Sequence, residues 1–317
     1  MYKLLLCWRY LLTRYLALAC IISVMLGVAT LIVVNSVMAG FSTKLKDRLH
    51  GLLSDVVVEA PSLEGFADAT EKMELIRQDP FLKSRIEALT ATLEVFAMLQ
   101  YQYHGETMTR PIRLIGIDPI GRAQVGGFAE NLVLQKNRLD PSFRLTPDAL
   151  WRQEMHNAPV FIGDDLQPAQ LEPGAPPPPS PPSQAFREGR LIGRPPASII
   201  IGYAIASFRV PANKEGEQTR EIRTLEPGDD VVITTVSGHR GQRLAPVYDR
   251  FVVCDYFKSE MSEYDANYVF MPLDYMQHLR TMENRATSIQ IKLKDYADAK
   301  PVVDALKAMF PTSAYLV

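Results

Sequence analysis

A long uncharged stretch near the N-terminus limits what this chain can fold into. Between Leu16 and Phe41 the sequence contains no Asp, Glu, Lys or Arg, and Arg14 and Lys44 lie on either side. As an α-helix this stretch would be about 39 Å long, which exceeds the roughly 30 Å thickness of a bilayer's hydrocarbon core. The sequence therefore predicts a membrane-spanning helix, at residues 15–41.

Two other roles are open to this stretch. A cleaved signal peptide has an apolar run of only about 7–15 residues, so the length favours a permanent anchor. The residues before Cys20 have some likeness to a lipoprotein cleavage site, but the apolar run continues through Ile21 and Ile22. Because basic residues flank both ends of the stretch in similar number, the positive-inside rule does not decide its direction.

The segments beside the span predict two further helices. Residues 1–14 place apolar side chains at helical spacing together with Trp8, which is typical of an interfacial helix, or they simply extend the span. Residues 42–54 carry Leu45 and Leu49 at helical spacing among charged residues. They predict a stalk helix that continues the span outward.

Beyond the stalk, residues 55–119 and 250–317 share a strand–helix–strand plan and predict one α/β lobe. Strands are expected at 55–61, 92–103, 109–118, 249–257, 268–273 and 288–295. We expect Asp68 to cap a helix that ends at Pro80, a second short helix to carry Leu82, Ile86 and Leu89, and Asp298 to cap a helix that contains Pro301 in its first turn.

Residues 120–249 predict a second, β-rich lobe inserted into the first, because short apolar runs alternate with Gly, Pro and Asp. Within it, residues 172–183 read EPGAPPPPSPPS. Proline lacks a backbone donor and cannot continue a helix, so this segment predicts an extended linker or surface loop. A docking site for a partner is the alternative.

Composition and motifs exclude several classes of function. The net charge is −2, and no basic stripe or recognition motif indicates nucleic acid. Cys254 is the single cysteine beyond the span, so the outer part cannot contain a disulfide framework. The sequence lacks a GxxxxGK[ST] phosphate loop, a GxSxG elbow and an HExxH motif.

No residue set predicts catalysis, a cofactor or a metal. The histidines, which are His50, His104, His156, His239 and His278, are scattered along the chain. Glu263 and Asp265, on either side of Tyr264, are the most suggestive acidic pair, but turn and capping roles fit them better than acid–base chemistry. The prediction is therefore a protein without catalytic, cofactor-binding or metal-binding residues.

Several segments resemble a known family. The run RYLALACIISVMLGVATLIVVNSVMAGFSTKLKDRLHGLLSDVVVEAP, from Arg14, is similar to the first membrane helix and stalk of ABC-transporter permeases of the LolC/LolE lipoprotein-release type, within the MacB/FtsX-like group. FVVCDYFKSEMSEYDANYVFMPLDYMQHL, from Phe251, resembles a later extracytoplasmic segment of these permeases, and IIIGYAIA and EPGDDVVITT resemble their strand–turn pieces. The likeness is poor across residues 120–195.

The resemblance implies an α+β fold: a transmembrane helix with a stalk, then a two-lobed MacB-like periplasmic core domain with a Porter-like α/β lobe and an inserted Sabre-like lobe. It implies a permease subunit of the bacterial cytoplasmic (inner) membrane, with a cytoplasmic N-terminus and residues 42–317 extracytoplasmic. Expected partners are an ABC ATPase subunit that binds the ATP, a second permease copy or paralogue, a lipoprotein or other envelope substrate, and the lipid bilayer.

Such permeases have further membrane helices, so the resemblance also implies that this chain is the front portion of a longer product, or one part of a split protein. The MSEYD run at Met261 favours lipoprotein release over MacB-like efflux or FtsX-like regulation of cell-wall hydrolases. A single-pass membrane-anchored sensor or binding protein is the alternative outside the family. It accounts for the lone span without further helices.

Overall fold

A computed structural model describes residues 15–52, 54–62, 64–157, 197–210, 220–237, 245–259, 261–310 and 315–316. The chain separates into two compact units, Met1–Gly51 and Leu52–Val317. The interfacial helix expected at residues 1–14 and the proline-rich segment at 172–183 lie outside the described residues, so both stay predictions.

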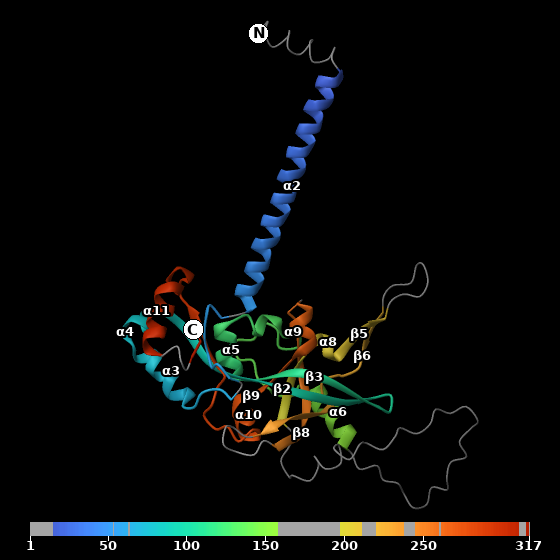
Figure 1. The fold of residues 1–317 in the computed structure, drawn as a ribbon. Coiled ribbons are helices and arrows are strands. Elements are labelled where there is room, and N and C mark those ends of the chain that lie inside the picture. The colour runs from blue at the N-terminus through green and yellow to red at the C-terminus, as the bar shows by residue number, and fades with distance from the viewer. Residues whose placement is uncertain are drawn as a thin grey trace, which may run out of the picture. The chain divides into compact units, whose positions relative to one another are not determined.

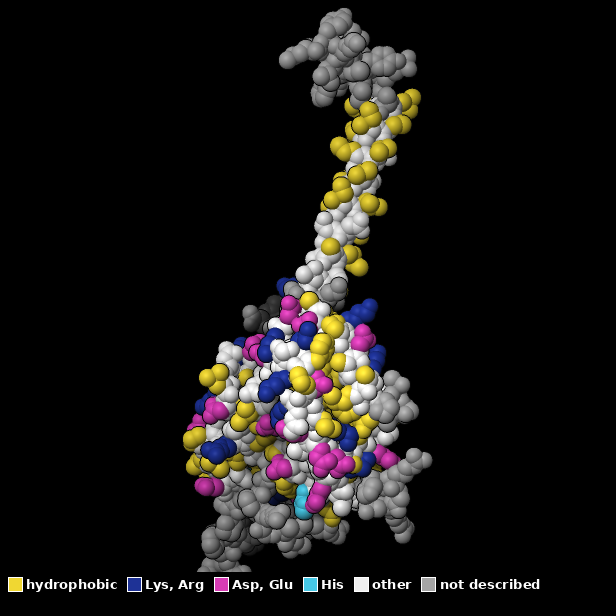
Figure 2. Space-filling view, turned by 90° about the vertical axis from the view of Figure 1, so that its left-hand side faces the viewer, with side chains coloured by type: hydrophobic (Ala, Val, Ile, Leu, Met, Phe, Trp, Pro, Cys, Tyr) yellow, Lys and Arg dark blue, Asp and Glu magenta, His cyan; other side chains and the backbone are white. Residues whose placement is uncertain are grey.

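The first unit is described by helix α2 (Tyr15–Leu52). Its stretch Leu18–Lys44 is long and apolar enough to cross a membrane, and none of it is buried within the structure. Apolar side chains cover the face of the helix that Figure 2 shows, and exposed apolar residues follow one another at Leu31, Ile32, Val33 and Val34, so they occupy every side of the helix. This is typical of a span rather than of a one-sided surface helix. The hydroxyls of Thr30 and Thr43 donate to the carbonyls of Leu26 and Ala39, so neither needs water.

The stalk expected at residues 42–54 is helical up to Leu52, without a break after the apolar stretch. The helix that was expected to end at Pro80 ends at Gln78, and Pro80 begins the next helix. Asp79 caps this second helix, because its carboxylate accepts hydrogen bonds from the backbone N–H groups of Phe81 and Leu82 at 2.8 and 3.0 Å.

The second unit is built from strands and short helices, which Figure 1 labels. The strands are β1 (Val56–Glu59), β2 (Ile86–Tyr103), β3 (Glu106–Ile117), β4 (Ala197–Gly202), β5 (Ser207–Val210), β6 (Arg220–Arg223), β7 (Asp230–Ser237), β8 (Ala245–Phe257), β9 (Tyr268–Pro272) and β10 (Ser288–Leu293). The α-helices are α3 (Ala69–Gln78), α4 (Pro80–Arg85), α5 (Pro119–Val125), α6 (Pro147–Asn157), α8 (Tyr203–Ala206), α9 (Ser262–Asn267), α10 (Leu273–Leu279) and α11 (Ala299–Met309), with 3-10 turns at Ala129–Asn131 and Tyr296–Asp298.

One mixed sheet organises this unit. Its eight strands follow the order β1-β10-β2-β3-β9-β4-β8-β7, and β5 and β6 pair separately. The long strand β2 also pairs with β7 through Met98–Thr234, Leu99–Ile233 and Gln100–Val232. This pairing closes β2, β3, β9, β4, β8 and β7 into a ring, so this part of the sheet is a barrel.

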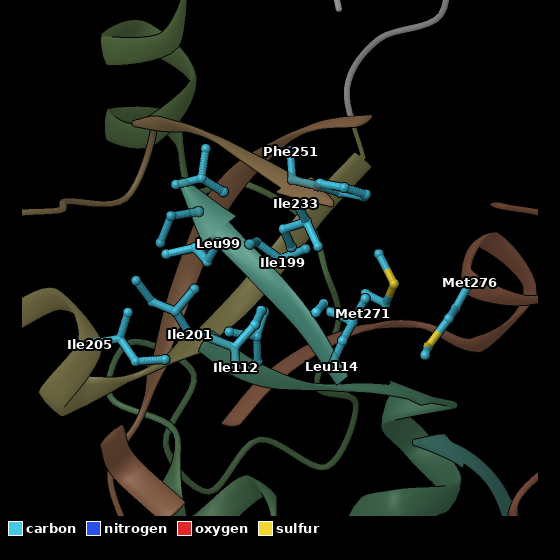
Figure 3. Close-up of a cluster of buried hydrophobic side chains, with 14 of the residues drawn as sticks. Leu99, Ile112, Leu114, Ile199, Ile201, Ile205, Ile233, Phe251, Met271 and Met276 are labelled. Carbon is cyan, nitrogen blue, oxygen red and sulfur yellow. The ribbon is translucent and has the colours of Figure 1, made fainter. Parts of the chain in front are cut away.

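The largest hydrophobic cluster fills the inside of this barrel, as Figure 3 shows. Alternate residues of β2, among them Leu93 and Leu99, point inward and are fully buried beside Ile199, Ile233 and Phe251 from the other strands. Two-residue periodicity therefore gives the strand one apolar side, and closure of the barrel buries it. Removal of this apolar surface from water is the main driving force for the fold.

Two further clusters extend this core. On β1, β10 and the first half of β2, residues such as Val58, Ala91 and Ile291 are covered by α3, α4 and α11, which lie together on one side of the domain in Figure 1. Outside the barrel, the segment that contains Phe128 and Leu132 covers a third cluster. The buried Asp255 fastens this segment, because its carboxylate accepts hydrogen bonds from the backbone N–H groups of residues 134 and 135 at 2.8 and 3.0 Å.

Three local predictions are wrong. Ile86 and Leu89 are not helical, because α4 ends at Arg85 and β2 begins at once; pairing with β10 outweighs the helical spacing. Asp68 precedes α3 but makes no capping bond with its side chain. Asp298 likewise precedes α11 without such a bond.

The cap of α3 comes instead from a distant loop. The Asn284 side-chain oxygen accepts hydrogen bonds from the Thr70 N–H at 3.1 Å and the Thr70 hydroxyl at 2.8 Å. The Asn284 carbonyl oxygen accepts a third from the Ala69 N–H at 3.0 Å. Asp68 has φ 57°, a left-handed conformation that turns the chain into the helix.

The division into two lobes stays a prediction. Strands β4 and β7, from residues 120–249, belong to the same sheet as β2 and β3. The expected boundary between residues 249 and 250 falls inside β8. Sheet formation thus joins both segments in one compact unit.

Candidate interaction site

Three side chains form a row across the outer face of the barrel. Phe96 on β2 lies opposite Arg113 on β3, and Arg113 lies opposite Tyr268 on β9. Because residues directly opposite on paired strands point to the same face, these side chains are neighbours. Phe96 is 61% exposed, so its ring presents apolar surface to solvent.

Arg113 connects this row to Glu94. Its Nη1 lies 3.0 Å from the Glu94 carboxylate and 3.5 Å from the Tyr268 hydroxyl, and its guanidinium lies 5.5 Å from the centre of the Phe96 ring. The Tyr268 hydrogen bond is the main cause that raises the pKa of Arg113 above its ordinary value. Arg113 is therefore a permanent cation, and the apolar ring of Phe96 lies beside its guanidinium.

Glu94 lies two residues before Phe96 on β2. Burial raises the pKa of its carboxyl above the ordinary value, and the nearby guanidinium groups of Arg113 and Arg122 oppose this rise. Glu94 is therefore engaged mainly with Arg113, since that pair is in ion-pair contact.

Arg122 lies on helix α5, which packs against β2. Asp118 begins this helix by accepting a hydrogen bond from the Gly121 N–H at 3.0 Å, which fixes the first turn just before Arg122. The Arg122 Nη1 is enclosed and has no hydrogen-bond partner within the part of the chain that the structure describes. Burial lowers the pKa of Arg122 to about 10, against the effects of Tyr268, Tyr264 and Glu94, so it stays charged at neutral pH.

Tyr264 on α9 and Tyr268 at the start of β9 lie at the corner between these two elements. Their rings meet edge to face, with centroids 4.7 Å apart. Asp265 holds the corner by accepting hydrogen bonds from the Ser259 N–H at 2.7 Å and the Ser259 hydroxyl at 2.8 Å. The backbone of Gly202 packs against this corner. Glycine is required there, because a Cβ at position 202 would lie 2.2 Å from the Asp265 carbonyl oxygen.

A small depression opens beside these residues. It has a volume of about 180 Å³ and is lined by Phe96, Pro111, Ile112, Arg113, Glu263, Asn267 and Tyr268. Glu94, Arg113, Arg122, Tyr264 and Tyr268 are called the Arg–Tyr cluster below. The lining of the depression combines apolar side chains with Arg113 and Tyr268 from this cluster and with the carboxylate of Glu263.

A second, larger groove of about 570 Å³ lies where α3 and α4 meet the start of β2. Its charged lining mixes both signs, with Glu74 and Glu87 beside Arg77 and Lys83. No side chain there favours one class of ligand.

Where the structure describes them, the residues that the sequence singled out do not gather into one site. His156 lies 3.8 Å from Asp229, His104 lies in the turn between β2 and β3, and His278 lies at the end of α10. His239 lies outside the described residues. Asp265 has the turn role that the sequence favoured, and Glu263 lines the depression.

Among the described residues, no group of three or more His, Cys, Asp or Glu side chains has the geometry of a metal site. The Arg–Tyr cluster was missed because its members lie on segments that are far apart in sequence. Strand register makes Arg113 and Tyr268 neighbours, and α5 and α9 carry Arg122 and Tyr264. One signal was present: Phe96 and Met98 occupy outward positions of β2, where alternation requires polar residues.

Comparison with known proteins gave weak likenesses only. No family model and no curated protein matches this chain. A solved extracellular domain of the noncanonic ABC-type transporter YknZ from Gram-positive bacteria is similar with a TM-score of 0.38 and 13% identity, over 82% of this chain and 97% of that one. The periplasmic region of MacB from Actinobacillus actinomycetemcomitans gives a TM-score of 0.38 and 12% identity, over 84% of this chain and 90% of that one.

Both neighbours are outer domains of ABC transporters. At these TM-scores and identities the likeness does not establish a common fold or a family for this chain.

Proposed function

We propose that this chain acts as a permease subunit of an ABC transporter of the lipoprotein-release type. The sequence resemblance described above suggests the assignment. One structural observation supports it: helix α2 continues from an apolar stretch long enough to span a bilayer into a charged stretch, and residues 53–55 alone separate it from β1.

The proposed mechanism is mechanical. A partner subunit binds and hydrolyses ATP in the cytoplasm, and its closure moves the membrane end of α2. A continuous helix resists bending because each turn is held by backbone hydrogen bonds, so it can carry this motion outward. The free energy comes from the different affinities of ATP for two states of the transporter.

The test is an insertion after Gly51. Seven residues of Gly-Ser sequence would break the helix, whereas seven helix-forming residues of the Glu-Ala-Ala-Ala-Lys type would lengthen it by about 10 Å and nearly preserve its rotational phase. The natural protein, purified with its ATPase partner, is reconstituted in proteoliposomes with a lipid-anchored lipoprotein.

We expect the Gly-Ser insertion to abolish ATP-dependent lipoprotein release and leave ATPase binding intact, while the helical insertion retains part of the release. Release at the natural rate in the Gly-Ser variant would contradict mechanical coupling. Failure of the natural protein to bind any ATPase subunit would favour the single-pass binding protein instead.

A further inference from the structure

We propose that the start of strand β2 binds an extended segment of a partner protein, which adds to the sheet as one more strand. The first observation is that this part of β2 has a free edge. Strand β3 pairs with β2 only from Thr92 onward, so residues 86–91 have a strand neighbour on one side alone, β10. An unpaired edge presents backbone N–H and C=O groups with which another extended chain can pair.

The backbone of Leu89 shows where these groups point. The Thr92 carbonyl accepts a hydrogen bond from the Thr287 N–H, next to β10, at 2.9 Å. Because successive residues of an antiparallel strand direct these groups to opposite edges, Leu89 directs its N–H and C=O groups away from β10. Among the described residues, neither β3 nor any turn or helix cap bonds to Leu89 at this edge. Leu89 also lines the groove of about 570 Å³ described above, so its free backbone groups lie beside an open space.

This groove runs across the free edge. Leu89 points to the face of the sheet that α3, α4 and α11 cover. Thr90 points to the other face, where a Cβ on Gly121 of α5 would lie 2.8 Å from its hydroxyl oxygen. Helices α3 and α5 are therefore on opposite faces of β2. Since residues of α3 and Gln124 of α5 both line the groove, it passes from one face to the other along the edge of the strand.

The lining of the groove indicates which kind of segment fits. Its charged side chains are equal in number for the two signs: Glu74, Glu87, Arg77 and Lys83. This balance favours an uncharged segment. Ile86 and Leu89 belong to the apolar cluster on the α3 side, whereas Gln124 lies on the α5 side. Because side chains alternate along a strand, we expect apolar residues of the segment to face α3 and polar residues to face α5.

Two hexapeptides of alternating Val and Thr test the site. The first is N-methylated at alternate residues, so it keeps hydrogen-bond donors along one edge. The second is N-methylated at every residue and has no backbone donor, although its side chains are the same. Each carries a fluorescent label, and its binding to the full chain in a nonionic detergent is followed by fluorescence anisotropy.

Two variants of the chain test the position. Gln124→Trp places a large ring in the groove. Ile120→Trp is the matched control, because Ile120 lies on the same helix, is 46% exposed and is not part of the lining. Thermal melting of each variant establishes that it is folded. Hydrogen exchange of the natural chain, with and without the first peptide, reports on the Leu89 amide.

We expect the first peptide to bind saturably and to slow exchange at Leu89. Full N-methylation and Gln124→Trp should each weaken binding about tenfold or more, whereas Ile120→Trp should leave it unchanged. No binding of the first peptide, equal binding of the two peptides, or equal weakening by the two Trp variants would overturn the proposal. Dimers of the chain that the first peptide dissociates would assign the edge to a second copy instead. None of these outcomes involves ATP coupling, so this site and the proposed function can fail separately.

Discussion

The cap of α3 offers a sharp test, because sequence and structure assign it to different residues. Asn284→Gly removes the oxygen that accepts from the Thr70 N–H and hydroxyl, at 3.1 and 2.8 Å, and keeps a residue that tolerates φ 50°. Loss of a side-chain cap costs about 1 kcal/mol, within a range of about 0.5–2. With a urea slope of about 2 kcal/mol per M, the unfolding midpoint should fall by roughly 0.5 M.

Two variants control this experiment. Asn284→Asp keeps the acceptor oxygen and should leave the midpoint nearly unchanged, and Asp68→Gly should shift it little, because Asp68 makes no capping bond with its side chain. Urea unfolding followed by circular dichroism gives the midpoints, and hydrogen exchange at the start of α3 should quicken only in Asn284→Gly. A larger loss in Asp68→Gly than in Asn284→Gly would refute this account of the cap.

Two further predictions concern strand β2. Leu99→Ala should lower the free energy of unfolding by about 2–5 kcal/mol, because Leu99 is fully buried inside the barrel. Met98→Ala, at a neighbouring position that is 40% exposed, should lower it by less than about 1 kcal/mol. Equal losses for the two variants in urea unfolding would contradict closure of the barrel. Burial raises the pKa of Glu94 in the folded state, so the stability that its carboxyl contributes is present below the unfolded pKa of about 4.3 and is lost as pH rises through the folded pKa. Glu94→Gln should therefore gain stability relative to the natural protein as pH rises from about 4 to 7; a widening loss over that range would show that pairing with Arg113 outweighs burial.

Much of the second unit could be predicted from the sequence. The strands at β1, β3, β8, β9 and β10 lie close to their expected ranges, because alternation and turn residues act locally. His104 and Gly105, at φ 49° and 82°, form the expected turn between β2 and β3. The helix expected around Ile86 failed because its spacing fitted a helix while its pairing partner, β10, lay about two hundred residues away.

The candidate site could not be predicted in this way. Phe96, Arg113 and Tyr268 become neighbours only when β2, β3 and β9 pair in one particular register. The helix that carries Arg122, α5, packs against β2. Contacts between such distant segments leave no pattern among neighbouring residues of the sequence.

The sequence alone determined the features that depend on nearest neighbours: the apolar helix, the alternation of the strands and the positions of the turns. Only the tertiary structure decided that β2 closes onto β7, that Asn284 caps a helix 214 residues earlier in the chain, and that the Nη1 atom of Arg122 is enclosed without a hydrogen-bond partner among the described residues. The reason is physical. Local preferences act over a few residues, whereas register, closure and burial depend on which distant segments displace water from one another.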